Sequence, residues 1–289
     1  MPKILGHDAI VKDLTKLAEK GGLSHGYIFS GAAMAGKRTV AQALAHLLEK
    51  GSFEIPTSHE VLQEAMVIDL AFAKSLDPDV KDSIGIDAVR EIKNFLWQKP
   101  NASPRRTLII DDAELLTTEA QNALLKITEE PPPSSLLIII ASDLEGLMGT
   151  IRSRLQVVHF GAVPERGIAA WLEESGVKKA DAAIYSKRAL GKPGLAFALA
   201  HDKGFRDRIG LAEKFLKTTP AGRREFIKKL IEPDDFSLRN FLEAVIITLA
   251  WEKPSRAKAA LWHKTLSLYR DIGNFSLNPR LQLENILIP

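Results

Sequence analysis

Short, uniformly apolar segments alternate along the first half of the chain with segments of helical periodicity. The apolar segments expected as strands include "HGYIFSG", "EAMVIDLAF", "RRTLIIDD" and "SSLLIIIAS". Amphipathic stretches such as "KRTVAQALAHLLEK" lie between them. A strand that is apolar on both faces must be covered on both faces, and alternating strands and helices form a parallel sheet. The sequence therefore predicts an α/β fold in which helices flank a parallel sheet.

The pattern changes near Val163–Pro164, after which every segment has helical spacing and none has the pattern of a strand. A second change in character lies around Gly204. We therefore expect an α/β domain over residues 1–163, a small helical domain over residues 164–204, and an all-helical domain over residues 205–289.

The composition excludes several classes of protein. None of the 289 residues is cysteine, so disulfides, cysteine-based zinc modules and thiol catalysis are excluded. We see no signal peptide and no apolar run long enough to span a bilayer, so we expect a cytoplasmic protein without a membrane partner. The net charge of +3 is too small to indicate nucleic-acid binding. The last third of the chain is weakly basic. Either its basic residues form an ordinary solvated helical surface, or they attract DNA phosphates weakly.

The segment "GAAMAGKRT" has the outline of a phosphate-binding loop, with Gly31, Gly36 and Lys37 at the expected spacing. It lies between an expected strand and an expected helix, where backbone N–H groups and the helix N-terminus surround phosphate oxygens. The next residue should offer a hydroxyl to magnesium, but it is Arg38, a permanent cation without an acceptor atom. Thr39 follows, yet one helical step turns a side chain by about 100°, so we expect it to point away.

Two aspartates, Asp111 and Asp112, end the expected strand "RRTLIIDD". The first occupies the position that holds magnesium near a phosphate loop. Asp112 stands where an ATPase places the glutamate that polarises water. It is one methylene shorter, and a small misplacement of a catalytic group costs a large factor in rate. The sequence therefore predicts weak magnesium binding, little or no hydrolysis, and weak binding of ATP or ADP through the backbone and Lys37.

The order of these motifs resembles a known family. The segments "HGYIFSGAAMAGKRT", "LIIDDAELLTTEAQNALLKITEEPPP" and "IRSRLQ" are similar to those of the clamp-loader subunits of the bacterial replicative DNA polymerase, within the AAA+ superfamily. Among these subunits, the chain looks most similar to the delta prime subunits of DNA polymerase III. The resemblance extends from about Gly6 to Leu199 and reappears at "NPRLQLENIL" near the C-terminus.

The resemblance implies a RecA-like AAA+ domain, a helical lid and a helical collar for oligomerisation. It also implies a hetero-oligomeric loader that places the ring-shaped sliding clamp on primed DNA during replication. The implied partners are the ATPase subunits (gamma/tau), the clamp-opening delta subunit and, through them, the clamp and the DNA. Delta prime subunits hydrolyse little or nothing and supply an arginine to the neighbouring ATPase subunit. Here that arginine is Arg154, in Ser153-Arg154-Leu155, which would act as an arginine finger in trans.

The chain departs from the family pattern at several positions. It has no cysteine for the zinc module that delta prime subunits usually carry, Gly194 stands where active subunits have a nucleotide-sensing arginine, and Leu155 replaces a cysteine. Ser142 follows the fourth expected strand, where it is either a polar sensor of nucleotide or the cap of the strand end.

The resulting interpretation is a delta prime-like subunit that does not hydrolyse ATP. Two alternatives stay open from the sequence. An active gamma/tau-like ATPase subunit of the same loader would hydrolyse ATP in a manner that depends on Lys37. A AAA+ adaptor outside replication would co-purify with proteins other than loader subunits.

Overall fold

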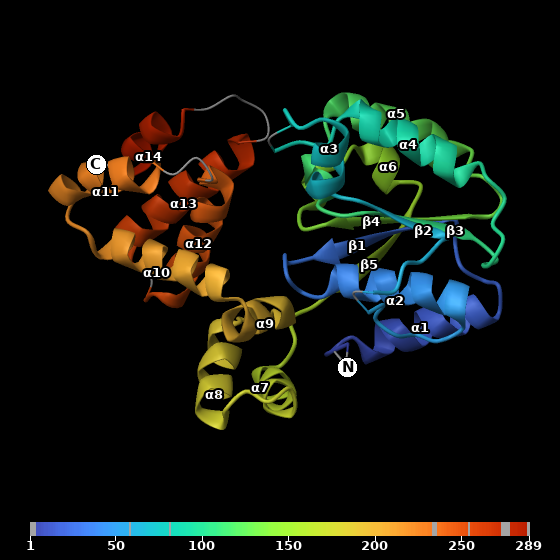
Figure 1. The fold of residues 1–289 in the computed structure, drawn as a ribbon, viewed down its shortest axis with the longest axis horizontal. Coiled ribbons are helices and arrows are strands. Elements are labelled where there is room, and N and C mark those ends of the chain that lie inside the picture. Colours follow the sequence, from blue (N-terminus) through green and yellow to red (C-terminus); the bar gives the residue numbers. More distant parts are fainter. Residues whose placement is uncertain are drawn as a thin grey trace. The chain divides into compact units, whose positions relative to one another are not determined.

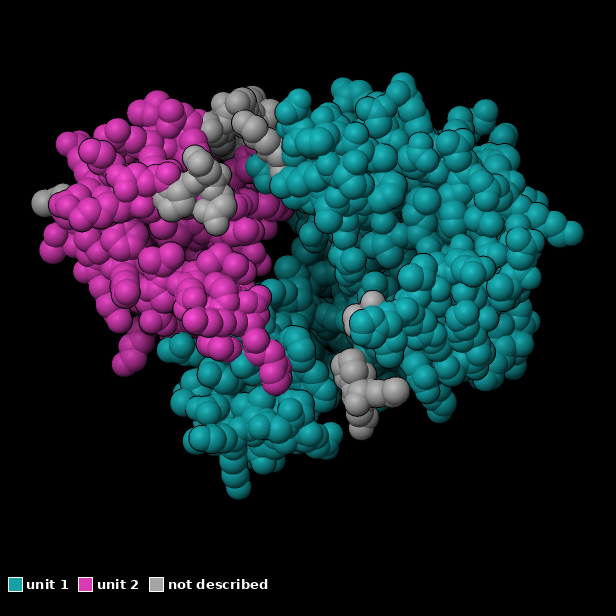
Figure 2. Space-filling model, in the orientation of Figure 1, with its two compact units in different colours: residues 1–200 teal, residues 201–289 magenta. Residues whose placement is uncertain are grey.

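The computed structural model describes residues 4–57, 59–80, 82–232, 236–253, 255–272 and 278–287. The chain divides into two compact units, Met1–Ala200 and His201–Pro289, which Figure 2 colours separately. The first unit contains the sheet, and the described part of the second is helical.

A five-stranded sheet is the framework of the first unit. Its strands are β1 (Gly26–Gly31), β2 (Ala65–Ile68), β3 (Arg106–Ile110), β4 (Ser135–Ala141) and β5 (Gln156–Phe160). The strand order is β2-β3-β4-β1-β5, and every neighbouring pair is parallel. The parallel sheet expected from the sequence is confirmed. Because all strands run the same way, the loops that follow them begin at one common edge.

Helices cover both faces of this sheet (Figure 1). They are α1 (Asp8–Glu19), α2 (Lys37–Lys50), α3 (Leu70–Leu76), α4 (Ile86–Leu96), α5 (Thr118–Glu129) and α6 (Gly149–Arg152), with short 3-10 turns η1 (Ala113–Leu115) and η2 (Leu144–Gly146). Along β1, Ile28 packs in a cluster with residues of α4 and α5, and its neighbour Phe29 packs with residues of α1 and α2. Both side chains are fully buried. Successive strand residues point to opposite faces, so an apolar strand serves a core on each side.

The segment "EAMVIDLAF" is expected as one strand, and the second half of that expectation is wrong. Only Ala65–Ile68 pairs in the sheet, and α3 begins at Leu70. Asp69 turns the chain into the helix because its carboxylate accepts the N–H of Phe72, an N-terminal cap. An apolar run does not distinguish strand from helix, whereas this cap does.

Three further helices complete the first unit: α7 (Glu165–Glu174), α8 (Lys179–Arg188) and α9 (Pro193–His201). They have an apolar cluster of their own, which includes Ile168, Leu172 and Ala196. The sheet and these helices nevertheless belong to one compact unit that ends at Ala200. A separate domain over residues 164–204 therefore stays a prediction.

The second unit consists of helices throughout its described residues. They are α10 (Lys203–Lys217), α11 (Pro220–Leu230), α12 (Leu238–Trp251), α13 (Arg256–Asp271) and α14 (Pro279–Leu287). Phe215 of α10 and Phe241 of α12 meet edge-on in its core, with ring centroids 5.4 Å apart. Within the described ranges, none of the helices has the length and apolarity that crossing a bilayer requires.

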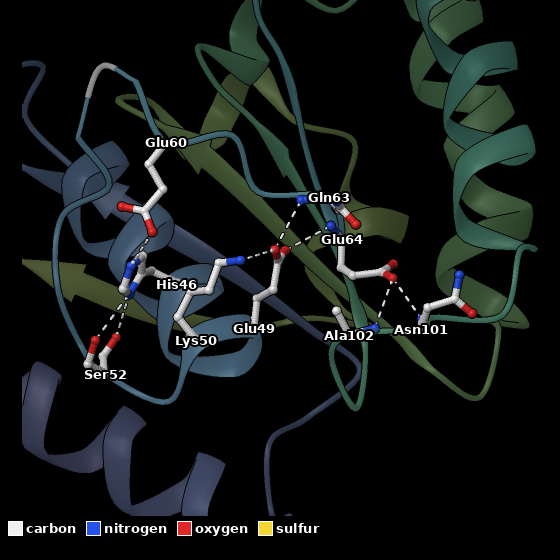
Figure 3. A network of polar contacts seen from close by, with 9 residues as sticks. All are labelled: His46, Glu49, Lys50, Ser52, Glu60, Gln63, Glu64, Asn101 and Ala102. Atoms are coloured by element: carbon white, nitrogen blue, oxygen red, sulfur yellow. Dashed lines mark hydrogen bonds and ion pairs between the residues drawn. The ribbon is translucent and has the colours of Figure 1, made fainter.

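Side chains of α2 hold the segment that connects this helix to β2 (Figure 3). His46 is buried; its Nδ1 donates to the carbonyl oxygen of Ser52 at 2.8 Å, and its Nε2 lies 3.1 Å from Oε1 of Glu60. One turn further along α2, the Glu49 carboxylate accepts the backbone N–H of Glu64 at 2.9 Å. Burial raises the pKa of Glu49, but its hydrogen bonds with backbone N–H groups outweigh burial and hold the pKa below its usual value. Hydrogen bonds to one helix thus fix the start of β2.

Glu64 extends this network to β3 and to the loop that precedes it. Its side chain is buried, and its carboxylate accepts the backbone N–H groups of Asn101 at 2.7 Å and Ala102 at 3.3 Å (Figure 3). The Nε of Arg106 lies 3.2 Å from the second carboxylate oxygen, an ion pair without the alignment of a hydrogen bond. The guanidinium of Arg106 also lies over the ring of Phe95, 4.8 Å from its centroid.

Replacing Glu64 by alanine should destabilise the first unit, because Arg106 would be left buried without its counter-ion. Breaking a buried pair from one side costs about 3–5 kcal/mol, and we expect a loss of this size in the free energy of unfolding measured by urea denaturation. Glu54→Ala, an exposed carboxylate of the same segment, is the matched control and should change the value by less than about 0.5 kcal/mol. Equal stability of the two variants would contradict the assigned role of Glu64.

Candidate nucleotide site

The phosphate-type loop lies between the end of β1 and the start of α2. Gly36, the residue before α2, has φ +99°, and Met34 in the middle of the loop has φ +62°. A Cβ atom on Gly31 would lie 2.4 Å from the carbonyl oxygen of Phe160 on β5, so this crossing requires glycine. The loop therefore has the strand-to-helix context that its sequence pattern demands.

Lys37 is turned into the loop that it follows. Its Nζ donates to the carbonyl oxygens of Gly31 at 2.5 Å and Ala32 at 2.8 Å, and it lies 3.5 Å from the Oγ of Ser142. Burial lowers the pKa of Lys37, and the negative charges of Glu114 and Asp111 oppose this only in part. A phosphate bound here would have to draw the ammonium away from these carbonyl groups.

Arg38 makes two ion pairs with carboxylates at the edge of the sheet. Its Nη1 lies 2.8 Å from Oδ2 of Asp69 and 3.1 Å from Oδ2 of Asp111. Burial lowers the pKa of Arg38, but its hydrogen bond with Asp69 and the charge of Asp111 outweigh burial, so the pKa is raised. The residue that breaks the sequence motif is therefore a cation that two acidic residues share.

Asp112 and Ser142 lie at the same edge, after β3 and β4. Asp112 is exposed, has φ +47°, and donates its backbone N–H to Oδ1 of Asp111 at 3.1 Å. The backbone N–H of Ser142 lies 3.4 Å from each carboxylate oxygen of Glu114. The structure thus gathers most of the expected site residues around the loop, although their roles stay predictions.

Sequence reasoning missed two members of this group, Asp69 and Glu114. Asp69 follows β2 as Asp111 follows β3, and Ile68 and Ile110 are paired in register. An aspartate directly after each of two apolar strands was a readable signal, because parallel strands bring such residues to one edge. The position of Asp69 at a strand end was missed because the whole run "EAMVIDLAF" was expected as a strand. Glu114 lies in a short 3-10 turn, for which the sequence carries no clear pattern.

An apolar cavity of about 310 Å³ adjoins the loop. Its lining comes from the N-terminal segment, the loop and start of α2, the segment between α2 and β2, and the helices α7 and α9. The lining residues are Ile4, Leu5, His7, Gly36, Thr39, Ile55, Trp171, Pro193, Gly194 and Phe197. Thr39 therefore borders this cavity, while its neighbour Arg38 binds the two aspartates. A cavity of this size and apolarity is typical of small-molecule sites.

Gly194, in the first turn of α9, touches the loop directly. Its backbone N–H donates to the carbonyl oxygen of Met34 at 2.9 Å. A Cβ atom at this position would lie 2.9 Å from the same oxygen and 3.2 Å from the Cβ of Met34. Glycine at this position permits the backbone contact between α9 and the loop.

Arg154 lies beyond α6, and its guanidinium is bound to α5 and α6. Its Nη1 donates to the carbonyl oxygen of Thr150 at 2.7 Å, and its Nη2 lies 2.8 Å from Oε1 of Glu129. The side chain of Arg154 is 34% exposed and that of Glu129 50%. Arg154 is thus a partly exposed cation whose side chain is held in place by these two contacts.

Magnesium in phosphate-loop proteins is held by a hydroxyl after the lysine and a carboxylate of a neighbouring strand. Here Arg38 replaces the hydroxyl and sets a positive charge against Asp69 and Asp111, so these residues do not fit the ion. Over the described ranges, no group of three or more His, Asp or Glu side chains could hold a metal ion.

Gly194→Ala should weaken the packing of α9 on the loop, since the neighbour that the new methyl group meets is backbone. Overpacking of this kind costs about 1–3 kcal/mol, and we expect a loss of that size in the free energy of unfolding. Gly167→Ala in α7 is the control, because a Cβ there meets only an ordinary contact at 3.9 Å. Alanine favours helix over glycine by up to about 1 kcal/mol, so this control should be neutral or stabilising. A neutral Gly194→Ala would show that α9 does not need its close contact.

Similarity to known proteins agrees with this geometry. The family model described as DNA polymerase III, delta subunit, matches residues 6–164, more than half of the chain. The gamma/tau subunit of DNA polymerase III from Mycobacterium bovis is 30% identical over 187 residues, which cover 62% of this chain and 32% of that protein. The delta' subunit from Escherichia coli is 32% identical over 143 residues, which cover 49% of this chain and 43% of that protein. The chain thus spans less than half the length of these relatives.

Solved structures share the fold at lower sequence identity. A DNA polymerase III gamma subunit-related protein from Thermotoga maritima has a TM-score of 0.59 and 23% identity, covering 96% of this chain and 97% of that one. RuvB from the same organism, in its T158V form, has a TM-score of 0.50 and 16% identity, covering 96% and 87%. The fold is therefore the α/β AAA+ fold with a largely helical C-terminal region. On the family match, this chain belongs to the DNA polymerase III delta subunit family.

Proposed function

We propose that this chain is a delta prime-like subunit of the DNA polymerase III clamp loader, which loads the sliding clamp onto primed DNA. In this proposal it does not hydrolyse ATP itself. The observation that carries the proposal is the pairing of Arg38 with Asp69 and Asp111 in a member of this family. A cation fixed at that place is incompatible with the magnesium chemistry of an ATPase.

Two further features of the site support the absence of hydrolysis. Asp112 is shorter than the glutamate that would orient water, and its backbone is in the left-handed region. At Gly194 the chain has no side chain that could reach a phosphate, and the backbone there is bonded to Met34. Restoring a single residue would therefore leave the other parts of the site unsuited to hydrolysis.

In this proposal ATP or ADP binds weakly, held by the loop backbone, Lys37 and the adjoining apolar cavity. The nucleotide base would lie in the apolar cavity, and the backbone N–H groups of the loop would bind the phosphates. The hydrogen bonds of Lys37 to Gly31 and Ala32 oppose binding, because a phosphate must compete with them.

The useful chemistry of the chain would be supplied to another subunit. Arg154 is the proposed finger, which would stabilise charge on the terminal phosphate of ATP in a neighbouring gamma/tau-type subunit. Its partial exposure and its contact with Glu129 suit a group that is held at a surface until a partner engages it. The remaining proposed partners are the delta subunit, the clamp and, through the assembled loader, primed DNA.

Arg154→Ala should lower ATP turnover in a loader reconstituted with gamma/tau and delta subunits. An arginine finger raises the rate of hydrolysis about 10³-fold or more at the ATPase site that it serves. The variant should therefore lose the contribution of that one site to the total ATP turnover of the loader. Arg152→Ala is a matched control, since Arg152 is similarly exposed at 33% and also pairs with a glutamate, Glu145. Unchanged turnover with Arg154→Ala would remove the finger assignment.

The isolated chain should bind ADP weakly and equally well in magnesium and in EDTA, because the metal position is occupied by Arg38. Titration calorimetry measures both conditions, and Lys37→Ala should weaken binding in each. The similarity to gamma/tau subunits supports one alternative function, that of an active ATPase subunit. Tight binding that requires magnesium, with ATP turnover that Lys37→Ala abolishes, would favour that alternative.

A further inference from the structure

Two carboxylates are forced together at the ends of β2 and β3. Ile68 and Ile110 are paired in register, and the backbone N–H of Asp111 donates to the carbonyl oxygen of Ile68 at 2.8 Å. Asp69 and Asp111 therefore follow neighbouring strands at the same level. Their side chains are only 21% and 16% exposed, so water screens their mutual repulsion poorly.

Each carboxylate also accepts a backbone hydrogen bond that keeps it in place. Oδ1 of Asp69 caps α3 by accepting the N–H of Phe72 at 2.9 Å, and Oδ1 of Asp111 accepts the N–H of Asp112 at 3.1 Å. In both residues the other oxygen, Oδ2, is the one that meets Arg38. The two Oδ2 atoms thus converge on one position, which a cation must fill.

Arg38 reaches that position from the first turn of α2. A single nitrogen, Nη1, contacts both Oδ2 atoms at 2.8 Å and 3.1 Å. A guanidinium is always charged and has no acceptor atom, so it satisfies the carboxylates and offers a metal ion nothing. Magnesium would have to displace it and approach a positive charge to do so.

We propose that Arg38 is a permanent internal counter-ion in the place of a divalent metal, tying the first turn of α2 to the ends of β2 and β3. Removing its charge opens a divalent-cation site between Asp69 and Asp111. This inference gives a structural reason for the proposed absence of hydrolysis, and its functional meaning rests on the proposed function. Its test uses metal binding by the isolated full chain, so its failure is distinguishable from a failure of trans activation in the reconstituted loader.

The probe is Mn²⁺ alone, followed by the loss of its free-ion electron paramagnetic resonance signal as it binds the full-length chain. The wild-type chain should bind Mn²⁺ only weakly. Arg38→Ser, which adds a hydroxyl as it removes the cation, should bind one equivalent at least tenfold more tightly than wild type. The double variant Arg38→Ser/Asp111→Asn should lose that gain. Arg90→Ser is the matched control, because it removes an exposed arginine paired with a single aspartate, Asp87, and should behave as wild type.

Two results would overturn the inference: wild-type binding as tight as that of Arg38→Ser, or no gain in Arg38→Ser. If Arg38→Ser does not fold, Arg38→Ser/Asp69→Asn decides, since it leaves one carboxylate in place of two. The inference expects circular dichroism to show this double variant folded. A double variant that is as unfolded as Arg38→Ser would mean that Arg38 does not act as the counter-ion of Asp69.

Discussion

The parallel pairing of β1, β4, β3 and β2 is the constraint on which the candidate site depends. It brings the carboxyl ends of four strands to one edge, so residues far apart in the chain become neighbours there. Ser142 lies beside the Nζ of Lys37, and Asp69 and Asp111 share one cation. None of these contacts is local in sequence, and each follows from the strand order.

Charge balance at that edge then determines what the site can do. A magnesium ion arrives with nucleotide and leaves with it, whereas a guanidinium attached to α2 stays. In the proposed function this difference separates a subunit that cycles through hydrolysis from one that keeps a single arrangement. The contact of Gly194 with Met34 acts in the same direction, since it joins the backbone of α9 directly to the loop.

The segment between α2 and β2 depends on a polar network in the same unit. Side chains of α2, led by His46 and Glu49, hold this segment by hydrogen bonds. Glu64 and Arg106 continue the network as a buried pair. A buried polar network of this kind requires each member to keep its partner, because an unpaired buried charge is costly.

The sequence by itself determined the parallel α/β fold, the place of the phosphate-type loop between β1 and α2, and the family. Apolar strands, helical periodicity and glycine spacing are local patterns, and local patterns can be read directly. It also showed that Arg38 could not act as a ligand of magnesium. Only the tertiary structure decided where that arginine goes, because its partner Asp69 lay inside a run expected as strand. Likewise, only the structure revealed that Gly194 lies against Met34 and that Arg154 pairs with Glu129. These contacts join segments distant in the chain, and no periodicity or spacing encodes them.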